Sequence, residues 1–322
     1  MGVVRDAFAL AVVVAAVVVS PLAIPAAQSQ TAIKLIIPYP PGGGADVLAR
    51  ILANQIANMG GPTMVVENRP GAGTVIGTKD VVRAAPDGNT LLLTNNALLL
   101  APHLHKLDYD PLSSLEPICS VGTTPTVVVV NSGSPYRTLD DLIGAARTRP
   151  GALTFGANIG ALSHVSYEML MHRADFKMTL VPYSGTLPEV EAVFAGQIDT
   201  AFVDYPPAQG LLQAGKIKAL ASASRARVDW LPDIPTVSEL GYKNFEVELW
   251  YGVLAPAHTP HDITAKFADW FTKAAQQPQI RSQLLKDGID TAAIFGAPFA
   301  AALRKRFDEY GQVIREANIK AE

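Results

Sequence analysis

The chain has 322 residues and a nearly balanced charge, with 26 basic and 29 acidic side chains and a net charge of −3. Its basic residues are scattered rather than gathered in a stripe, which argues against a nucleic-acid partner. The single cysteine, Cys119, excludes an intramolecular disulfide, so packing has to stabilise the fold. At this length one hydrophobic core usually divides into two.

The N-terminal segment has the order of features found in secretory signal peptides. An apolar run over residues 7–19 leads into small residues around Ala27 and Ser29, where cleavage is expected. The run is shorter than the roughly 20 residues that span a bilayer. An uncleaved membrane anchor reaching Ile24 is the alternative. We therefore predict a signal peptide over residues 1–29 and an exported, periplasmic mature protein.

The next informative segment is a short apolar strand that runs into a glycine loop and a helix. The strand is predicted over Leu35–Pro38, the loop contains Gly42, Gly43 and Gly44, and the helix extends from Asp46 to Asn58. Glycines allow a ligand to approach the backbone closely, and the first turn of a helix offers unpaired N–H groups. The segment predicts an anion site, with a purely structural turn as the alternative.

Strand-like and helical segments alternate along the rest of the chain, which predicts an α/β architecture with mostly parallel sheets. Helices are expected around Leu139–Ala146, with Thr138 as the N-cap, and over Glu189–Ala195. Further strands are predicted over Met64–Glu67, Thr90–Thr94, Thr126–Val130, Thr154–Phe155, Leu180–Pro182, Thr200–Val203 and Ala219–Ser222.

Polar side chains follow some of these strands, at the ends where crevices of α/β proteins form. Asn95 and Asn96 follow one strand, and Asp204 follows another. An acid at position 204 suits a ligand amino or hydroxyl group, and a solvent-facing side chain is the alternative for each of the three. Asp46 either complements the dipole of its helix or contacts the ligand, directly or through water.

Two groups of reactive side chains admit a catalytic or metal-binding alternative. Ser163 and His164 point about 100° apart if helical, and no Gly-x-Ser-x-Gly elbow surrounds the serine, so a hydrolase is disfavoured. His103 and His105 stand near two aspartates, but such histidines are more often solvated or structural than metal ligands. No dinucleotide or phosphate-loop motif occurs. We expect neither catalysis nor a cofactor nor a metal.

Ordered segments along the mature chain resemble the Bug family, the TctC-like substrate-binding proteins of tripartite tricarboxylate transporters. The similar segments are residues 37–46, 65–73, 85–88, 181–185, 196–199, 214–221, 231–236 and 250–252. The resemblance implies a two-domain periplasmic binding protein of type II-like α/β fold, with a hinge and an interdomain ligand cleft. Domain one is expected to comprise residues 30–127 and 250–322, and domain two residues 128–249.

The resemblance also implies that one loop from each domain grips the ligand, largely through backbone N–H groups and ordered water. In this chain the loops are residues 39–46 and 156–164, the second leading into a helix at Val165. Together with the strand ends, they give the expected ligand-binding residues Tyr39, Pro41, Gly42, Gly43, Gly44, Ala45, Asp46, Asn95, Asn158, Gly160, Ala161, Ser163 and Asp204.

One carboxylate of the ligand is expected to be bound mainly by backbone N–H groups of Gly42 to Ala45, without an arginine clamp, because a helix begins at this glycine run and no basic residue lies between Lys34 and Arg50. Gly43→Val should therefore weaken binding, through its Cβ or through a φ angle that only glycine tolerates, whereas Arg50→Ala and Arg69→Ala should leave affinity within roughly tenfold.

The second loop departs from the family pattern. Asn158 stands at a usual glycine and Ala161 at a usual serine or threonine. This departure favours a ligand that is monoanionic, larger or aromatic at that end, with Ile159 and Leu162 offering apolar contact.

The function implied is that of a monomeric solute-binding protein which captures a small carboxylate and delivers it to the membrane permease subunits of a tripartite tricarboxylate transporter. The ligand is expected to be a di- or tricarboxylate, an acidic amino acid or an aromatic carboxylate. A sensor that acts on a receptor ectodomain is one alternative, and an exported hydrolase is a less favoured one.

Overall fold

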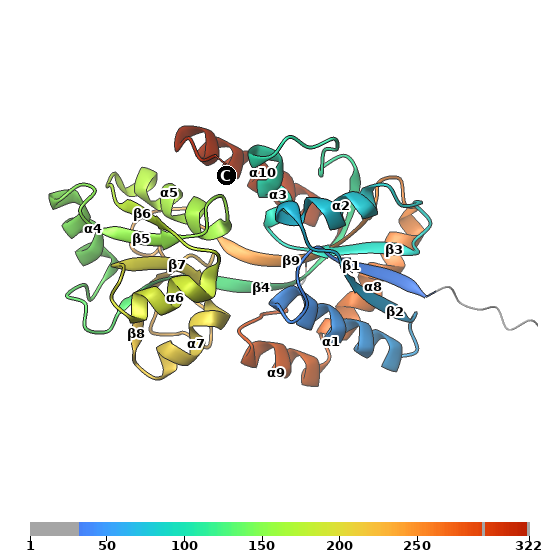
Figure 1. The fold of residues 1–322 in the computed structure, drawn as a ribbon. Coiled ribbons are helices and arrows are strands. Elements are labelled where there is room, and N and C mark those ends of the chain that lie inside the picture. The colour runs from blue at the N-terminus through green and yellow to red at the C-terminus, as the bar shows by residue number, and fades with distance from the viewer. Residues whose placement is uncertain (1–31, 292–293, 321–322) are drawn as a thin grey trace, which may run out of the picture. The chain divides into compact units, whose positions relative to one another are not determined.

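The computed structural model describes residues 32–291 and 294–320, in which strands and helices alternate (Figure 1). The predicted signal peptide and its cleavage site lie outside these residues. No helix in the described part of the chain has the length and apolarity required to cross a membrane. The strands are β1 (Ile33–Ile37), β2 (Met64–Asn68), β3 (Thr90–Thr94), β4 (Leu115–Asn131), β5 (Thr154–Ala157), β6 (Thr179–Pro182), β7 (Thr200–Asp204), β8 (Ile217–Ser222) and β9 (Glu248–Pro256).

The α-helices are α1 (Gly44–Asn58), α2 (Val75–Val82), α3 (Ala97–Leu104), α4 (Leu139–Thr148), α5 (Leu162–Ala174), α6 (Thr186–Phe194), α7 (Tyr205–Gln213), α8 (His261–Ala275), α9 (Pro278–Lys286) and α10 (Gly296–Glu316), with a short 3₁₀ helix over Ala72–Thr74. The N-cap predicted at Thr138 is confirmed, because its hydroxyl accepts the N–H of Asp141 and the Asp141 carboxylate accepts the N–H of Thr138.

The strands form a mixed sheet, so the expectation of mostly parallel pairing is wrong. Their order is β2-β1-β3-β9-β4-β7-β5-β6, with β8 also paired to β4. β1 pairs in parallel with β2 and β3, and β5 pairs in parallel with β6 and β7. Every pair that involves β4 or β9 is antiparallel. These two long strands run against their neighbours and join what would otherwise be two separate parallel sheets.

β4 connects two parts of the sheet. Its residues Leu115–Pro125 pair with β9, and Thr126–Asn131 pair with β7 and β8. We call β2, β1, β3, β9 and the first part of β4 the first half-sheet, and the second part of β4 with β7, β8, β5 and β6 the second half-sheet. The sequence predicted only the second part of β4. The first part contains Pro117 and Pro125, and proline argues against a strand because it has no N–H to donate to a neighbouring strand.

Helices cover both faces of each half-sheet. On one face, α1, α8 and α9 pack on the first half-sheet around Leu48 and Phe271, and α6 and α7 pack on the second around Val190. On the other face, α2, α3, α4, α5 and α10 share a continuous core that includes Tyr167 and Tyr310. Because α10 contacts both α3 and α5, this core extends beneath both half-sheets.

The predicted second loop is shorter than expected. Gly156 and Ala157 belong to β5, and α5 begins at Leu162 rather than at Val165. Ser163 therefore lies in the first turn of a helix, where its hydroxyl can reach loop atoms that precede the helix.

Candidate functional site

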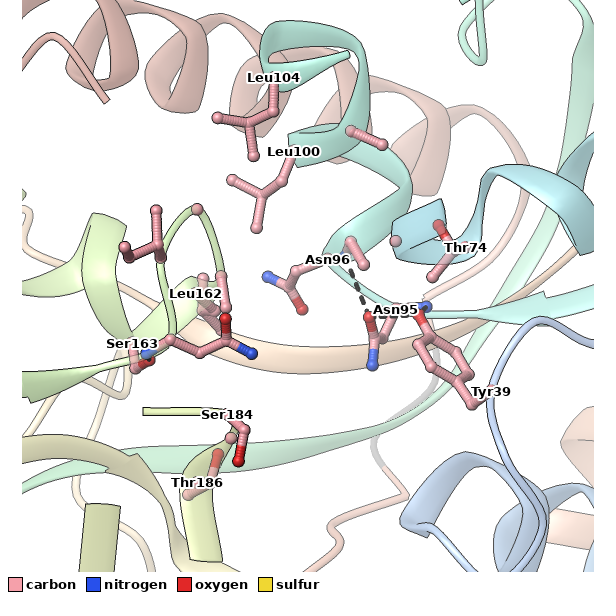
Figure 2. Close-up of a pocket in the computed structure, with 18 of the residues that line it drawn as sticks. Tyr39, Thr74, Asn95, Asn96, Leu100, Leu104, Leu162, Ser163, Ser184 and Thr186 are labelled. Carbon is pink, nitrogen blue, oxygen red and sulfur yellow. Dashed lines mark hydrogen bonds between the residues drawn. The ribbon is translucent and has the colours of Figure 1, made fainter. Parts of the chain in front are cut away.

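A cavity of about 1040 Å³ lies at the carboxyl ends of strands from both half-sheets. The loops that follow β1, β2 and β3 form one side, and the loops that follow β5 and β6 form the other, together with Asp204 at the end of β7. Figure 2 shows Tyr39, Thr74 and Asn95 across the cavity from Ser163 and Thr186. This is the position where open α/β sheets bind ligands, and the volume suits a small organic molecule.

The structure brings together about half of the expected ligand-binding residues. The cavity is lined by Tyr39, Asn95, Asn158, Gly160, Ala161, Ser163 and Asp204. The other predicted residues are not among those that line it: Pro41, Gly42, Gly43, Gly44, Ala45 and Asp46. Their part in ligand binding stays a prediction, and the residues from Pro41 to Gly44 are exposed.

Asp46 is buried and holds the glycine loop in place. Its carboxylate accepts the Gly42 N–H at 2.9 Å, Arg50 Nε at 3.1 Å and Asn68 Nδ2 at 3.0 Å. The hydrogen bond from Arg50, with those from Gly42 and Asn68, lowers the pKa of Asp46 to about 2 despite its burial. The structural alternative for Asp46 is therefore the one these contacts support, and the Gly42 N–H is already in use.

Asp46→Asn is expected to lower the free energy of unfolding near neutral pH by about 1–2 kcal/mol. A carboxyl whose pKa is depressed in the folded protein contributes stability above its unfolded pKa, and that contribution is lost as the pH falls toward 2. Urea denaturation at neutral and acidic pH measures the difference. Asp262→Asn is the matched control, because Asp262 also precedes a basic residue, Lys266, by one turn but is 72% exposed. An equal effect of both changes would contradict the anchoring role of Asp46.

Glycine is required at the two neighbours of Gly43, and not at Gly43 itself. Gly43 has φ −76°, and the nearest atom to an added Cβ is 3.8 Å away, so the expectation of a glycine-only φ there is wrong. Gly42 has φ +86°, which favours glycine. A Cβ on Gly44 would lie 2.6 Å from the hydroxyl of Tyr251. The loop therefore needs Gly42 for its backbone and Gly44 for close packing.

Tyr39 and Asn95 form a polar pair on the side of the first half-sheet. The Tyr39 hydroxyl donates to Asn95 Oδ1 at 2.5 Å, and the same oxygen accepts the Ala97 N–H at 3.0 Å. Burial raises the pKa of Tyr39, so the phenol stays protonated. Because the amide oxygen is engaged, the amide nitrogen of Asn95 is the group left to donate to a ligand.

Thr74 is a second donor on this side and was missed by the sequence analysis. It is 4% exposed, and its hydroxyl has no hydrogen-bond partner among the described residues. Gly71, Ala72, Gly73 and Thr74 all have positive φ angles, which costs of the order of 1–3 kcal/mol at each non-glycine residue. Thr74 borders the cavity, and a strained backbone with an unpaired buried hydroxyl at this place favours a role in ligand binding.

On the opposite side, Ser163 links the second loop to a buried acid. Its hydroxyl donates to Glu189 Oε1 at 3.1 Å and accepts the Asn158 N–H at 3.3 Å. Glu189 has no exposed surface, and its Oε2 has no partner in the described part of the chain. Burial raises the pKa of Glu189 to about 8. The hydrogen bond from Ser163 lowers this pKa, and the nearby Asp204 raises it further. The sequence placed Glu189 in the first turn of a helix but gave no sign of its burial.

Asp204 reaches the cavity itself. Burial raises the pKa of its carboxyl to about 6, and a hydrogen bond from the Thr186 side chain acts in the opposite direction. The remaining wall is largely apolar, with Leu100 and Leu104 from α3, together with Leu162. The cavity thus combines a few polar groups with an apolar body.

The catalytic and metal alternatives find no support in these contacts. The Ser163 hydroxyl donates to Glu189, and His164 Nδ1 instead accepts the N–H of Gly160 at 3.2 Å. His103 packs on Phe307 and bonds its carbonyl oxygen. The described residues contain no cluster of side chains that could hold a metal ion.

Sequence and structure comparisons place this architecture among known proteins. A family model described as tripartite tricarboxylate transporter family receptor matches residues 48–319. The structure of the periplasmic binding protein BugD is 30% identical, with a TM-score of 0.73, and the match covers 90% of this chain and 98% of BugD.

Two further structures carry ligands. MatC from Rhodopseudomonas palustris, with bound malate, is 28% identical with a TM-score of 0.72, over 88% of this chain and 98% of MatC. A protein from R. palustris with adipate is 25% identical with a TM-score of 0.76, over 91% of this chain and 99% of that one. These likenesses confirm the predicted α/β binding-protein fold.

Proposed function

Because the chain belongs to the tripartite tricarboxylate transporter receptor family, we propose that it captures a small carboxylate between two domains and delivers it to the membrane permease subunits of such a transporter. The family consists of binding proteins, not enzymes, and BugD is a periplasmic member. We propose the periplasm for this chain as well, after removal of a signal peptide that ends near Ala27 or Ser29.

One observation carries the proposal: the cavity lies where strands of two half-sheets end, and loops from both contribute to it. Free donors at Asn95 and Thr74 support a carboxylate site on the first half-sheet, and relatives bind malate and adipate. The predicted residues around the cavity, with Thr74 added, are the proposed ligand contacts. The N–H groups of the glycine loop would join them if the cavity closes.

The course of β4 supports the proposed domain division. β4 pairs with β9 up to Pro125 and with β7 and β8 from Thr126 onward. We propose domain one as residues 30–127 and 250–322, domain two as residues 128–249, and a hinge where β4 passes between them. A hinge of few residues is how such proteins close around a ligand.

A carboxylate screen tests the proposal. At a concentration of 100 times its dissociation constant, a bound carboxylate should add about 2.7 kcal/mol of stability, seen as a rise in Tm. Asn95→Ala should weaken the best carboxylate by about tenfold or more, since a charge-assisted hydrogen bond is lost. Arg69→Ala is the control, because Arg69 is 53% exposed, pairs with Glu67 and does not line the cavity.

The two variants also distinguish a carboxylate that is bound by Asn95 from one that is bound by an arginine. If Arg69→Ala abolished binding while Asn95→Ala bound normally, the carboxylate would be held elsewhere. If di-, tri- and aromatic carboxylates all left the Tm unchanged, the protein would not be a carboxylate receptor.

A further inference from the structure

The polar groups of the cavity differ between its two sides. On the first half-sheet, Thr74 Oγ1 and Asn95 Nδ2 make no hydrogen bond to a described residue, and both are donors. On the second half-sheet stand two carboxyl groups, that of Asp204 in the lining and that of Glu189 directly behind Ser163. Among the lining residues, all of which the structure describes, there is no lysine or arginine. A ligand meets donors and no carboxylate at one end, and at the other end it meets the Asp204 carboxyl group beside the side chains of Asn158 and Ser184.

Donors in the loop before α5, which a second carboxylate would need there, are largely in use. The Ser163 hydroxyl donates to Glu189, and the Asn158 N–H donates to Ser163. The N–H groups of Gly160 and Ala161 donate within the same segment, at 3.2 Å and 2.9 Å. The remaining N–H groups at the start of α5 carry the positive end of the helix dipole, but the carboxyl group of Asp204 lines the same cavity and opposes it.

We infer that the ligand carries a hydrogen-bond donor, an ammonium or a hydroxyl group, at the end that meets Asp204, rather than a second carboxylate. The inference rests on the proposed carboxylate-binding function and names the class of ligand. The carboxylate of the ligand meets Asn95 and Thr74, its body packs on Leu100 and Leu104, and Asp204 accepts the bond from its far end. Asp204 is in this way the residue that determines specificity.

The ionisation of the two acids agrees with this arrangement. Burial raises the pKa of Asp204 only to about 6, so Asp204 is charged near pH 7.5. Burial raises the pKa of Glu189 to about 8, so Glu189 is mostly protonated there. One negative charge therefore faces the ligand, which favours an ammonium most and disfavours a carboxylate.

Calorimetry near pH 7.5 with probes of matched length tests the inference. The six-carbon probes are hexanoate, 6-hydroxyhexanoate, 6-aminohexanoate and adipate, and a four-carbon series consists of butanoate, 4-hydroxybutanoate, 4-aminobutanoate and succinate. At the better length, the amino or hydroxy acid should bind at least about tenfold more tightly than the dicarboxylate. Asp204→Asn should reduce this preference to about threefold or less. Measurable binding of the plain monocarboxylate by this variant shows an intact site. Glu191→Gln, an exposed change on α6, should keep the preference.

The outcomes separate the inference from the proposed function. A dicarboxylate that binds more tightly than both donors of its length would overturn the inference and leave the carboxylate function standing. A preference that survives in Asp204→Asn would overturn the assignment of Asp204. Absence of binding by all the probes would overturn the inference, and only the additional absence of a Tm rise with every di-, tri- and aromatic carboxylate of the screen would contradict the proposed function.

Discussion

Glu189→Gln is expected to make the protein more stable than the wild type near pH 8, by about 2–4 kcal/mol, and to change stability near pH 5 by less than about 1 kcal/mol. The Glu189 carboxyl is fully buried, and its Oε2 has no partner among the described residues. Its pKa is raised from 4.5 to about 8 because burial disfavours the charged form. Glutamine reproduces the shape and neutrality of the protonated acid, and it still accepts the hydrogen bond from Ser163.

The sign follows from where each state releases its proton. In the unfolded chain the carboxyl ionises above about pH 4.5, whereas in the folded protein it stays protonated until about pH 8. The unfolded state therefore binds fewer protons across this range, and wild-type stability falls as the pH rises. Glutamine does not ionise, so the free energy of unfolding of the variant does not fall for this reason as the pH rises.

Urea denaturation at both pH values measures the effect. Glu191→Gln is the matched control, since Glu191 lies on the same helix but is exposed, and it should change stability by less than about 0.5 kcal/mol at either pH. If the Glu189→Gln difference were the same near pH 5 and near pH 8, the carboxyl would not be protonated in the folded protein.

Local sequence patterns predicted the features that depend on neighbouring residues. The capping residues around Thr138 lie within four positions of each other, so their hydrogen bonds follow from the sequence alone. Asn95 and Asp204 were placed at the cavity because each follows a short apolar strand, and strand ends meet at one edge of an α/β sheet. The family resemblance, carried by ordered motifs, predicted the fold.

Features that depend on distant partners were missed. Asp46 could be assigned either role from the sequence, and the partner that identifies a structural one, Asn68, comes from β2. Glu189 looks like an ordinary first-turn acid, because its burial depends on how α6 packs against β5 and β7. Thr74 has no sequence signal beyond its neighbouring glycines, since a positive φ at threonine is imposed by the surrounding structure.

Asn96→Ala is expected to lower the free energy of unfolding by about 2–4 kcal/mol. Asn96 is 1% exposed, and its side chain joins three elements. Its Nδ2 donates to the carbonyl oxygen of Glu248 at 3.0 Å and to the Tyr310 hydroxyl at 2.8 Å. Its Oδ1 accepts the Trp250 N–H at 3.0 Å. These bonds tie the start of α3 to β9 and α10.

The loss is large because alanine leaves buried partners unpaired. The Trp250 N–H and the Glu248 carbonyl lie on β9, and the hydroxyl of Tyr310 is fully buried, so water cannot replace the amide without opening the core. Chemical denaturation measures the change. Asn95→Ala is the control from the adjacent position, since Asn95 borders the cavity and its partner Tyr39 also lies within 3.2 Å of the Thr94 hydroxyl. We expect Asn95→Ala to cost less than about half as much stability and to act mainly on ligand affinity. The reverse order of stability losses would mean that Asn95, not Asn96, holds α3 to the sheet.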